Sequence, residues 1–363
     1  MTMKYIDEYR DRELISKLAG RIAESVNRDY TFMEVCGGHT AAIHRFGIPD
    51  LLPRNIKLIS GPGCPVCVTG TDFIDRAIAY SKMDNVIITT FGDLIRVPGS
   101  VTSLEKMNEE GADIRIVFSG LEALEIAKLN PQKKIIFLGI GFETTAPGTA
   151  VTIKQAEKEA IGNFFLLSAH KIMPPAMKAI VKEGTRLDGF ICPGHVAAIT
   201  GSSIFNFLPK EYDIGCVITG FEPTDLLQSL LMLTQQVNSK SPKVEIQYNR
   251  AVTVNGNQTA QQYMSDVFEK CDAYWRGFGV IKSSGLTLVK DFERFNAGSY
   301  MPFTVSHHED DKQCICPEIL RGLKEPGECP LFAKTCSPEN PVGACMVSPE
   351  GSCNTWYKYR VDR

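Results

Sequence analysis

Cysteine is the residue whose placement in this chain points most directly to chemistry. Six of the 12 cysteines lie close to the C-terminus among prolines and glycines: Cys314, Cys316, Cys329, Cys336, Cys345 and Cys353. Such a group either binds a metal cofactor or forms a disulfide knot. Zinc ribbons use tight Cys-x2-4-Cys pairs, which this segment lacks, whereas soft thiolates at wide spacing suit an iron–sulfur cluster with four ligands. The pattern therefore favours a cluster, with zinc as the alternative.

Another cysteine lies where a helix is predicted to begin, in Glu34-Val35-Cys36-Gly37-Gly38-His39-Thr40. An apolar run ends at this cysteine, two glycines permit a tight turn, and a helix through Phe46 follows. Because helix N-termini favour anions, we expect the thiolate of Cys36 to form more easily than that of a free cysteine. A buried structural cysteine beside a turn is the alternative.

A thiol pair follows in Ser60-Gly61-Pro62-Gly63-Cys64-Pro65-Val66-Cys67, ahead of a helix predicted from Thr71-Asp72 to Tyr80. Two cysteines at this spacing can close a small disulfide or supply half of a metal site. A structural zinc needs four ligands, so this pair alone is a half-site at best. Its place between a strand and a helix is typical of thioredoxin-like motifs, and we interpret it as a redox pair.

Two further loops carry polar residues after apolar runs. In the loop at 139–148, Thr144 occupies the place of the third glycine of a dinucleotide fingerprint and no Walker lysine is present, which disfavours nicotinamide and ATP. Thr145 and Pro147 can instead start a helix to Gly162, whose free N–H groups meet an anion or a polar ligand. The loop Cys192-Pro193-Gly194-His195 offers a histidine that can be acid, base or ligand.

All four loops follow predicted strands, and ligand crevices in open α/β sheets form at the carboxyl ends of strands. We therefore expect one crevice, and its predicted lining is Cys36, His39, Cys64, Cys67, Glu143, Thr144, Lys171 and His195. The remaining histidines considered, His44, His307 and His308, lack such a context and are interpreted as structural.

Short apolar, β-branched runs must position these loops, and they alternate with helical patterns. The predicted strands are 56–60, 86–90, 114–118, 135–140, 164–168, 189–192 and 216–219. Short runs bounded by Gly and Pro favour buried strands of a largely parallel sheet. A repeated Gly-Phe-Glu, at 141–143 and 220–222, suggests two related halves. We predict an α/β fold of two related parallel-sheet βα domains around a central cleft, with a C-terminal cysteine-rich iron–sulfur segment; the predicted divisions are 1–133, 134–240 and 241–363.

Composition narrows the classes of function. The 363 residues carry a net charge of −3, so there is no electrostatic case for a nucleic acid or an anionic membrane surface. The N-terminal residues lack the apolar core of a secretory signal, and no run approaches the ~18 apolar residues of a membrane span. We expect a cytoplasmic protein, in a reducing compartment that disfavours a disulfide knot.

The motifs together resemble the HypD family of [NiFe]-hydrogenase maturation factors. The resemblance rests on the loop sequences at 36–40, 61–67, 141–147 and 193–196 and on the cysteine tail, in this order along almost the whole chain. It implies a redox-active assembly scaffold, rather than an enzyme with conventional turnover, on which the Fe(CN)2CO unit is built. The implied partners are a HypC-type chaperone, HypE with HypF as the cyanide donor, and indirectly the hydrogenase large subunit.

The resemblance also implies roles for individual residues. Cys36 would hold the iron jointly with a cysteine of the chaperone, with His39 close by, and Cys64 and Cys67 would pass electrons to it. Glu143, Thr144, Thr145 and Lys171 would line the crevice, with His195, and guide an anionic or polar ligand to the iron.

For the tail, the family's likeness to ferredoxin:thioredoxin reductase implies a [4Fe-4S] cluster beside a redox-active thiol pair. The implied cluster ligands are Cys314, Cys329, Cys336 and Cys353, and the implied redox pair is Cys316 with Cys345; Cys314 and Cys316 fit either role. Two rival hypotheses stay open at this stage. One is a general thiol–disulfide oxidoreductase that uses Cys64 and Cys67, and the other is an interaction module with a structural zinc.

Overall fold

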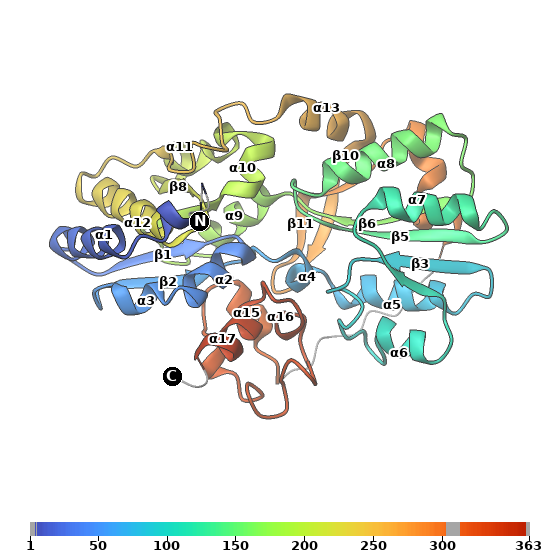
Figure 1. The fold of residues 1–363 in the computed structure, drawn as a ribbon, viewed down its shortest axis with the longest axis horizontal. Coiled ribbons are helices and arrows are strands. Elements are labelled where there is room, and N and C mark those ends of the chain that lie inside the picture. The colour runs from blue at the N-terminus through green and yellow to red at the C-terminus, as the bar shows by residue number, and fades with distance from the viewer. Residues whose placement is uncertain (1–3, 5, 303–312, 361–363) are drawn as a thin grey trace.

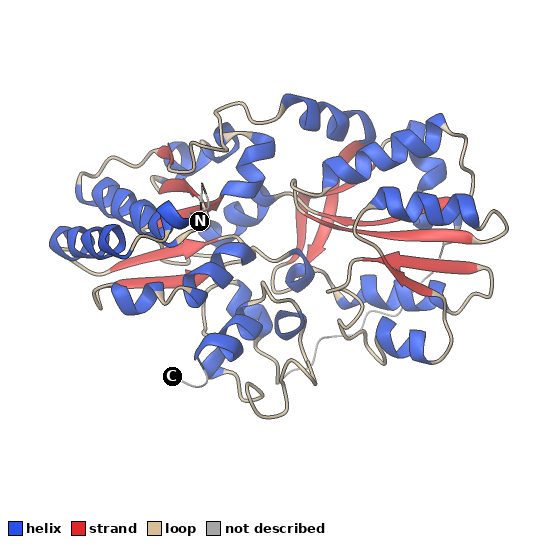
Figure 2. Ribbon diagram, in the orientation of Figure 1, coloured by secondary structure: helices blue, strands red, loops and turns tan. Residues whose placement is uncertain are grey.

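The computed structural model describes residue 4, residues 6–302 and residues 313–360, which form an α/β fold with two parallel sheets and a separate hairpin (Figures 1 and 2). His307 and His308 lie outside the described residues. The predicted fold class is confirmed. Among the helices described, none is long and apolar enough to cross a membrane.

The first sheet has five parallel strands and occupies the left half of Figure 1. Its strands, in spatial order, are β2 (Ile56–Ser60), β1 (Tyr30–Glu34), β7 (Gly189–Pro193), β8 (Gly215–Thr219) and β9 (Val244–Ile246). The helices of this half are α1 (Arg12–Ser25), α2 (Gly37–Arg45), α3 (Ile48–Leu51), α10 (Gly194–Thr200), α11 (Phe207–Tyr212) and α12 (Pro223–Asn238), with the 3-10 turns η1 (Asp7–Tyr9) and η2 (Ser202–Phe205).

The second sheet has four parallel strands and occupies the right half of Figure 1. Its strands, in spatial order, are β4 (Ile114–Ile116), β3 (Val86–Thr90), β5 (Lys134–Gly141) and β6 (Phe164–His170). The helices of this half are α5 (Thr71–Ser81), α6 (Leu104–Glu109), α7 (Gly120–Leu129) and α8 (Ala146–Lys158), and the short α4 (Pro65–Val68) lies between the two sheets. Helix α9 (Met173–Lys182) follows β6 but lies in the left half of Figure 1, beside the first sheet.

Strand pairing shows that the predicted division at residue 133 does not follow the sheets. Strands β1 and β2 share a sheet with β7 and β8, which come more than a hundred residues later, through the pairing of β1 with β7, while β3 to β6 form the other sheet. The chain therefore leaves the first sheet after β2 and returns to it at β7. Periodicity identifies strands but not their neighbours, because every buried parallel strand has the same near-continuous apolar pattern.

Alternation of side chains along the strands produces separate cores on the two faces of each sheet. In β5, Ile135 and Phe137 face α7 and α8, whereas Ile136 and Leu138 belong to the large core that also contains residues of α5 and α9. In the first sheet, Ile191 and Val217 face α12. The large core runs from one sheet to the other and into the cysteine-rich tail, so these three parts share one apolar interior.

The last third of the chain adds a hairpin and the cysteine-rich tail. Strands β10 (Phe268–Trp275) and β11 (Gly279–Leu288) pair antiparallel, and β11 contacts β6 and α9. The cysteine-rich tail, residues 313–360, lies below α2 and α4 in Figure 1 and contains little regular structure. The remaining elements are α13 (Gln258–Val267), η3 (Lys290–Phe295), α14 (Ala297–Tyr300), α15 (Cys316–Leu320), η4 (Pro326–Glu328), α16 (Ala344–Val347) and α17 (Ser352–Arg360).

Candidate functional site

The loop that follows β1 presents Cys36 at the N-terminus of α2. Cys36 is the N-cap residue, with an extended backbone, and its carbonyl accepts hydrogen bonds from the N–H groups of His39 and Thr40 at 2.8 and 3.0 Å. Its own N–H donates to the carboxylate of Glu34 at 2.9 Å. The side chain of Cys36 is partly exposed. Thus the predicted cysteine at a helix start is present, although the helix begins at Gly37.

The loop that follows β2 lies directly against Cys36. The N–H of Gly37 donates to the carbonyl of Gly63 at 3.0 Å, and a Cβ on Gly63 would lie only 2.1 Å from the backbone nitrogen of Cys36. Only glycine therefore permits this approach. Cys64 and Cys67 form a disulfide just beyond it, with 4% and 0% of their surfaces exposed.

The loop that follows β5 brings threonines to the same place. Gly141 has a φ of 139°, and a Cβ there would overlap the hydroxyl of Thr145, so this turn also requires glycine. Thr145 is the N-cap of α8, as predicted, but its hydroxyl donates to carbonyls of the turn, including that of Phe142 at 3.2 Å. Thr144 is exposed.

A cavity of about 320 Å³ lies where these loops meet. Its wall is made of Val35, Cys36, Gly63, Pro65, Val66, Phe91, Asp93, Ile140, Gly141, Phe142, Thr144, Thr145, Met173, Pro193, His195, Val196 and Glu350. Four of the predicted site residues are thus brought together: Cys36, Thr144, Thr145 and His195. The expected crevice exists, but fewer of the predicted residues line it.

The other predicted crevice residues lie behind the wall. Cys64, the N-cap of α4, and Cys67, within α4, are both buried. Glu143 is 3% exposed and accepts the N–H of Met173 at 3.0 Å, because the side chains of Phe142 and Thr144 take the cavity side of the loop. Lys171 is 4% exposed, and its amine lies 5.6 Å from the ring centre of Trp275. Burial lowers the pKa of Lys171 to about 8.

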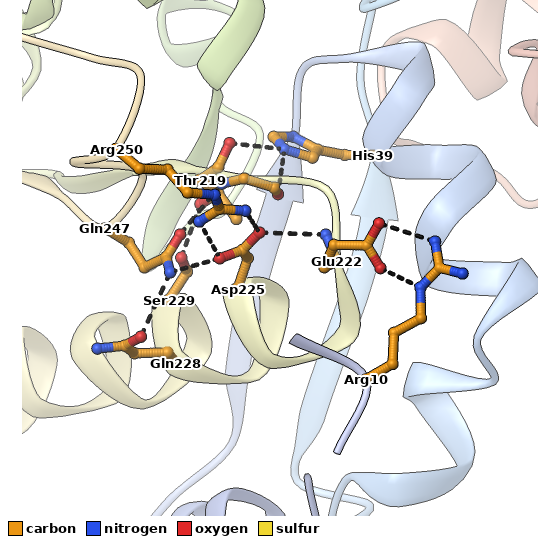
Figure 3. Close-up of polar contacts among 10 residues, drawn as sticks. Arg10, His39, Thr219, Glu222, Asp225, Gln228, Ser229, Gln247 and Arg250 are labelled. Atoms are coloured by element: carbon orange, nitrogen blue, oxygen red, sulfur yellow. Dashed lines mark hydrogen bonds and ion pairs between the residues drawn. The ribbon is translucent and has the colours of Figure 1, made fainter. Parts of the chain in front are cut away.

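His39 is also buried, in a structural arrangement that Figure 3 displays. Its Nε2 lies 3.1 Å from the carbonyl oxygens of both Thr219 and Gly220, which accept the ring N–H at the end of β8. The imidazole is therefore the Nε2–H tautomer, and burial lowers its pKa to about 4. The ring stacks on Phe221 at 4.5 Å, and His195 stacks on Phe221 as well, at 3.9 Å.

A buried polar network holds the β8 loop that receives His39 (Figure 3). The carboxylate of Asp225, which is fully buried, accepts two hydrogen bonds from Arg250 and one from Gln247. It also accepts the N–H of Glu222 at 3.2 Å, and Glu222 forms an ion pair with Arg10. The loop at 220–222 is therefore fixed, and through His39 it fixes the first turn of α2.

The sequence predicts that the helix N-terminus lowers the pKa of Cys36, but the pKa is raised instead. Burial raises the pKa of the Cys36 thiol to about 12, and the negative charge of Glu350 raises it further, whereas hydrogen bonds from the N–H groups of His39 and Gly38 only partly oppose this. Desolvation of a thiolate outweighs the helix dipole here. Cys36 is accordingly a protonated thiol near neutral pH until a cation approaches.

Three acidic residues near Cys36 were not predicted from the sequence. Asp93, in the loop after β3, and Glu350, in the tail, line the cavity. Glu34, at the end of β1, is 2% exposed and accepts the hydroxyl of Thr40; burial raises its pKa to about 7. Asp93 follows a predicted strand, as the chosen loop residues do, and that signal could have identified it. Nothing in the tail sequence indicates that Glu350 reaches Cys36.

The six tail cysteines lie close together. The sulfur atoms of Cys316 and Cys345 are 2.7 Å apart. Burial is the main cause of the raised pKa of the Cys314 thiol, and negative charge on Cys316, Cys329 and Cys336 would raise it further, so these cysteines are neighbours. Cys353 interacts with Cys345 and lies near Cys316, Cys314 and Cys336. Within the described ranges, no three His, Cys, Asp or Glu side chains are already arranged to hold a single metal ion.

The tail contacts the buried disulfide. Helix α16, which carries Cys345, packs against α4, which carries Cys67. Arg276 lies at this junction: its guanidinium donates to the carbonyl of Thr69 at 3.2 Å, and its charge favours the thiolates of Cys316 and Cys345. A continuous set of contacts thus leads from the tail through α4 and Gly63 to Cys36.

The close approach of Gly63 to Cys36 generates a prediction on stability. Gly63→Ala should lower the free energy of unfolding by about 1–3 kcal/mol, because the added Cβ forces the two loops apart. Gly148→Ala is the matched control: a Cβ there meets no atom within 4 Å and the site is inside α8, so this variant should gain roughly 0.5–1 kcal/mol. Urea unfolding measures both, and equal stability of the two variants would contradict the prediction.

Burial of Glu143 generates a pH-dependent prediction. Its pKa rises from 4.5 to about 7, so folding favours the protonated form, and stability falls as pH rises between these values. Glu143→Gln cannot ionise, and its loss of unfolding free energy between about pH 5 and about pH 8 should be roughly 2–3 kcal/mol smaller than that of the wild type. Parallel slopes for the two proteins in urea titrations across this range would refute an ionisable buried Glu143.

Comparison with known proteins confirms the family resemblance. The family model described as "HypD: Hydrogenase formation hypA family" matches residues 13–360. The Azotobacter vinelandii protein named hydrogenase maturation factor HypD is 46% identical over 371 residues, which cover 99% of this chain and 98% of that protein. The proteins of the same name from Escherichia coli K12 and Cupriavidus necator are 42% and 44% identical, over 99% and 98% of this chain and 98% and 97% of their own lengths. This chain belongs to the HypD family.

Proposed function

We propose that this chain acts in hydrogenase maturation as the scaffold on which the Fe(CN)2CO unit of [NiFe]-hydrogenase is assembled. The observation that carries the proposal is the position of Cys36: it is the cysteine on the wall of the cavity between the two sheets, partly exposed and held on a rigid turn. A thiolate fixed in this way can hold an iron ion while ligands are attached to it. The iron unit is the cargo of the protein and leaves with the finished group.

The geometry of Cys36 also leaves room for a second protein. One protein thiolate satisfies only one position of an iron ion, and among the described residues that line the cavity there is no second cysteine. We infer that a HypC-type chaperone supplies the other thiolate, that HypE with HypF delivers cyanide, and that the hydrogenase large subunit receives the product later. The protein is then a cytoplasmic assembly scaffold rather than an enzyme with conventional turnover.

The donor set of the tail suits an iron–sulfur cluster. Thiolates are the preferred ligands of such clusters, and Cys314, Cys329, Cys336 and Cys353 are the four that would hold a [4Fe-4S] group. When bound, the cluster would supply electrons, and it would also stabilise a segment that has little regular structure.

The two thiol pairs offer a path for electrons toward Cys36. Cys316 and Cys345 as a dithiol can reduce the Cys64–Cys67 disulfide by exchange: two electrons move, one disulfide forms and the other opens to two thiols. Helices α16 and α4 are in contact, which is the proximity that exchange requires. Cys64, the nearer thiol of the reduced pair, would then follow directly after Gly63, whose backbone lies against Cys36.

Burial of the disulfide argues against a general thiol–disulfide oxidoreductase. Attack on a protein substrate needs an accessible thiolate, but Cys64 is 4% exposed and Cys67 is fully buried. The segments next to this disulfide are the cysteine-rich tail and the turn that carries Cys36. The pair is placed for exchange within the protein.

Infrared spectroscopy tests the role of Cys36. Co-purified anaerobically with its chaperone, the wild-type protein should show nitrile and carbonyl bands, and Cys36→Ala should lose them because the iron has no thiolate on this chain. Cys271→Ala is the matched control, since Cys271 is another partly exposed free cysteine but lies on β10, away from the cavity wall. Bands that persist in Cys36→Ala would reject this cysteine as the iron ligand.

Replacement of one thiol of the disulfide tests the electron path. Cys64→Ser should leave the visible spectrum of the cluster unchanged, because Cys64 is no cluster ligand, yet hydrogenase maturation in a complemented strain should fall to background since no dithiol can form. Cys271→Ser should mature hydrogenase normally. Normal maturation by Cys64→Ser would exclude the exchange path while leaving the iron site at Cys36 intact.

A further inference from the structure

The charged side chains on the cavity wall are all acidic. Among the described residues that line the cavity, the charged ones are Asp93 and Glu350, and neither Lys nor Arg is present. The lysine expected to guide an anion, Lys171, lies behind the wall under Trp275. The cavity therefore has the charge that attracts cations, which is the opposite of the sequence-based expectation.

The side chain of Glu350 lies directly over the turn that holds Cys36. A Cβ on Gly37 would lie 2.6 Å from the Cβ of Glu350 and 3.0 Å from one of its carboxylate oxygens. Gly37 thus provides the space in which this carboxylate lies beside the helix start. The negative charge of Glu350 also acts on Cys36, where it disfavours the thiolate.

Asp93 extends the negative charge along the wall. It lies in the loop after β3, a strand of the second sheet, whereas Cys36 follows β1 in the first sheet. Burial is the main cause of the raised pKa of Glu350, and the negative charge of Asp93 raises it further. Asp93, Glu350 and Cys36 are thus electrostatically linked, although they come from three distant parts of the chain.

We propose that Asp93 and Glu350 make this cavity selective for a divalent cation and steer ferrous iron to Cys36 while repelling small anions. The inference rests on the proposed function, because it concerns the iron that Cys36 receives. Since these side chains and Cys36 are not arranged as a ready metal site among the described residues, the carboxylates act through their field rather than as ligands. Two carboxylates in a partly enclosed cavity raise the local concentration of cations and lower that of anions.

Two alkylating reagents measure this field at Cys36. Iodoacetate is an anion and iodoacetamide is neutral, but both form the same sulfur–carbon bond and release iodide, so the ratio of their rates cancels the reactivity of the thiol. Peptide mass spectrometry of the full chain follows Cys36 alone. In the wild type, iodoacetate should react disproportionately slowly, and Asp93→Asn or Glu350→Gln should raise the iodoacetate to iodoacetamide ratio roughly threefold to tenfold.

Matched variants separate charge from structure. Asp93→Glu keeps the charge and should keep the wild-type ratio. Asp84→Asn removes an equal charge at the opposite end of β3, where Asp84 is exposed, and should leave the ratio unchanged. About 1 M salt should abolish the difference between wild type and Asp93→Asn, because the screening length falls to about 3 Å, whereas a purely structural effect would persist. An unchanged ratio in both Asp93→Asn and Glu350→Gln would overturn the proposal.

Ferrous iron itself is the second probe. Under anaerobic conditions, the Fe²⁺ concentration that half-protects Cys36 from iodoacetamide should be several-fold higher in Asp93→Asn than in wild type or Asp84→Asn. Equal protection of wild type and Asp93→Asn would overturn the steering and leave Cys36 as the iron ligand. Absence of protection in the wild type would overturn the proposed iron site, whatever the alkylation ratio shows.

Discussion

The site depends on the contact between two glycine-containing turns, one after β1 and one after β2. Gly61 donates to the carbonyl of Glu34 at 2.8 Å, and the carbonyl of Gly63 accepts from Gly37 at 3.0 Å. The backbones approach so closely that no side chain fits at Gly63. This contact sets the position of Cys36 relative to Cys64, and the cavity wall, the disulfide and the tail are arranged around it.

The chain passes from the first sheet to the second and back, and this path brings residues of both sheets to the contact between the two turns. Because β1 and β2 share a sheet with β7 and β8, the turn that carries Cys36 faces the loop of His195, while β3 and β5 bring Asp93 and Thr144 from the other sheet. Ligand crevices form at the carboxyl ends of strands, and here the crevice lies between two such ends. The tail completes the wall with Glu350, so the cavity contains residues from both sheets and from the cysteine-rich segment.

Local features of this structure were predictable from sequence, whereas pairing and side-chain direction were not. Strands 56–60 and 86–90 match β2 and β3, because each is an apolar β-branched run with clear boundaries. The hairpin was missed, since β10 carries exposed charged residues at consecutive positions, Glu269 and Lys270, which interrupt the apolar pattern of a strand. In the loop after β5, a change of one position decides whether a side chain meets the cavity, so Thr144 lines it and Glu143 is buried. Contacts such as Glu350 over Gly37 join distant segments and have no local signal.

The negative charge of the cavity wall has opposite effects on a cation and on the Cys36 thiolate. It attracts the cation and disfavours the thiolate. Burial raises the pKa of the Cys36 thiol to about 12, and the negative charge of Glu350 raises it further, so this residue is a thiol rather than a thiolate near neutral pH. A thiol in this state is a poor nucleophile and resists oxidation and alkylation. An arriving divalent cation reverses the balance, because its charge stabilises the thiolate and the proton leaves. On the proposed function, the Glu350 carboxylate that disfavours the Cys36 thiolate is also one of the two groups that bring the iron to it.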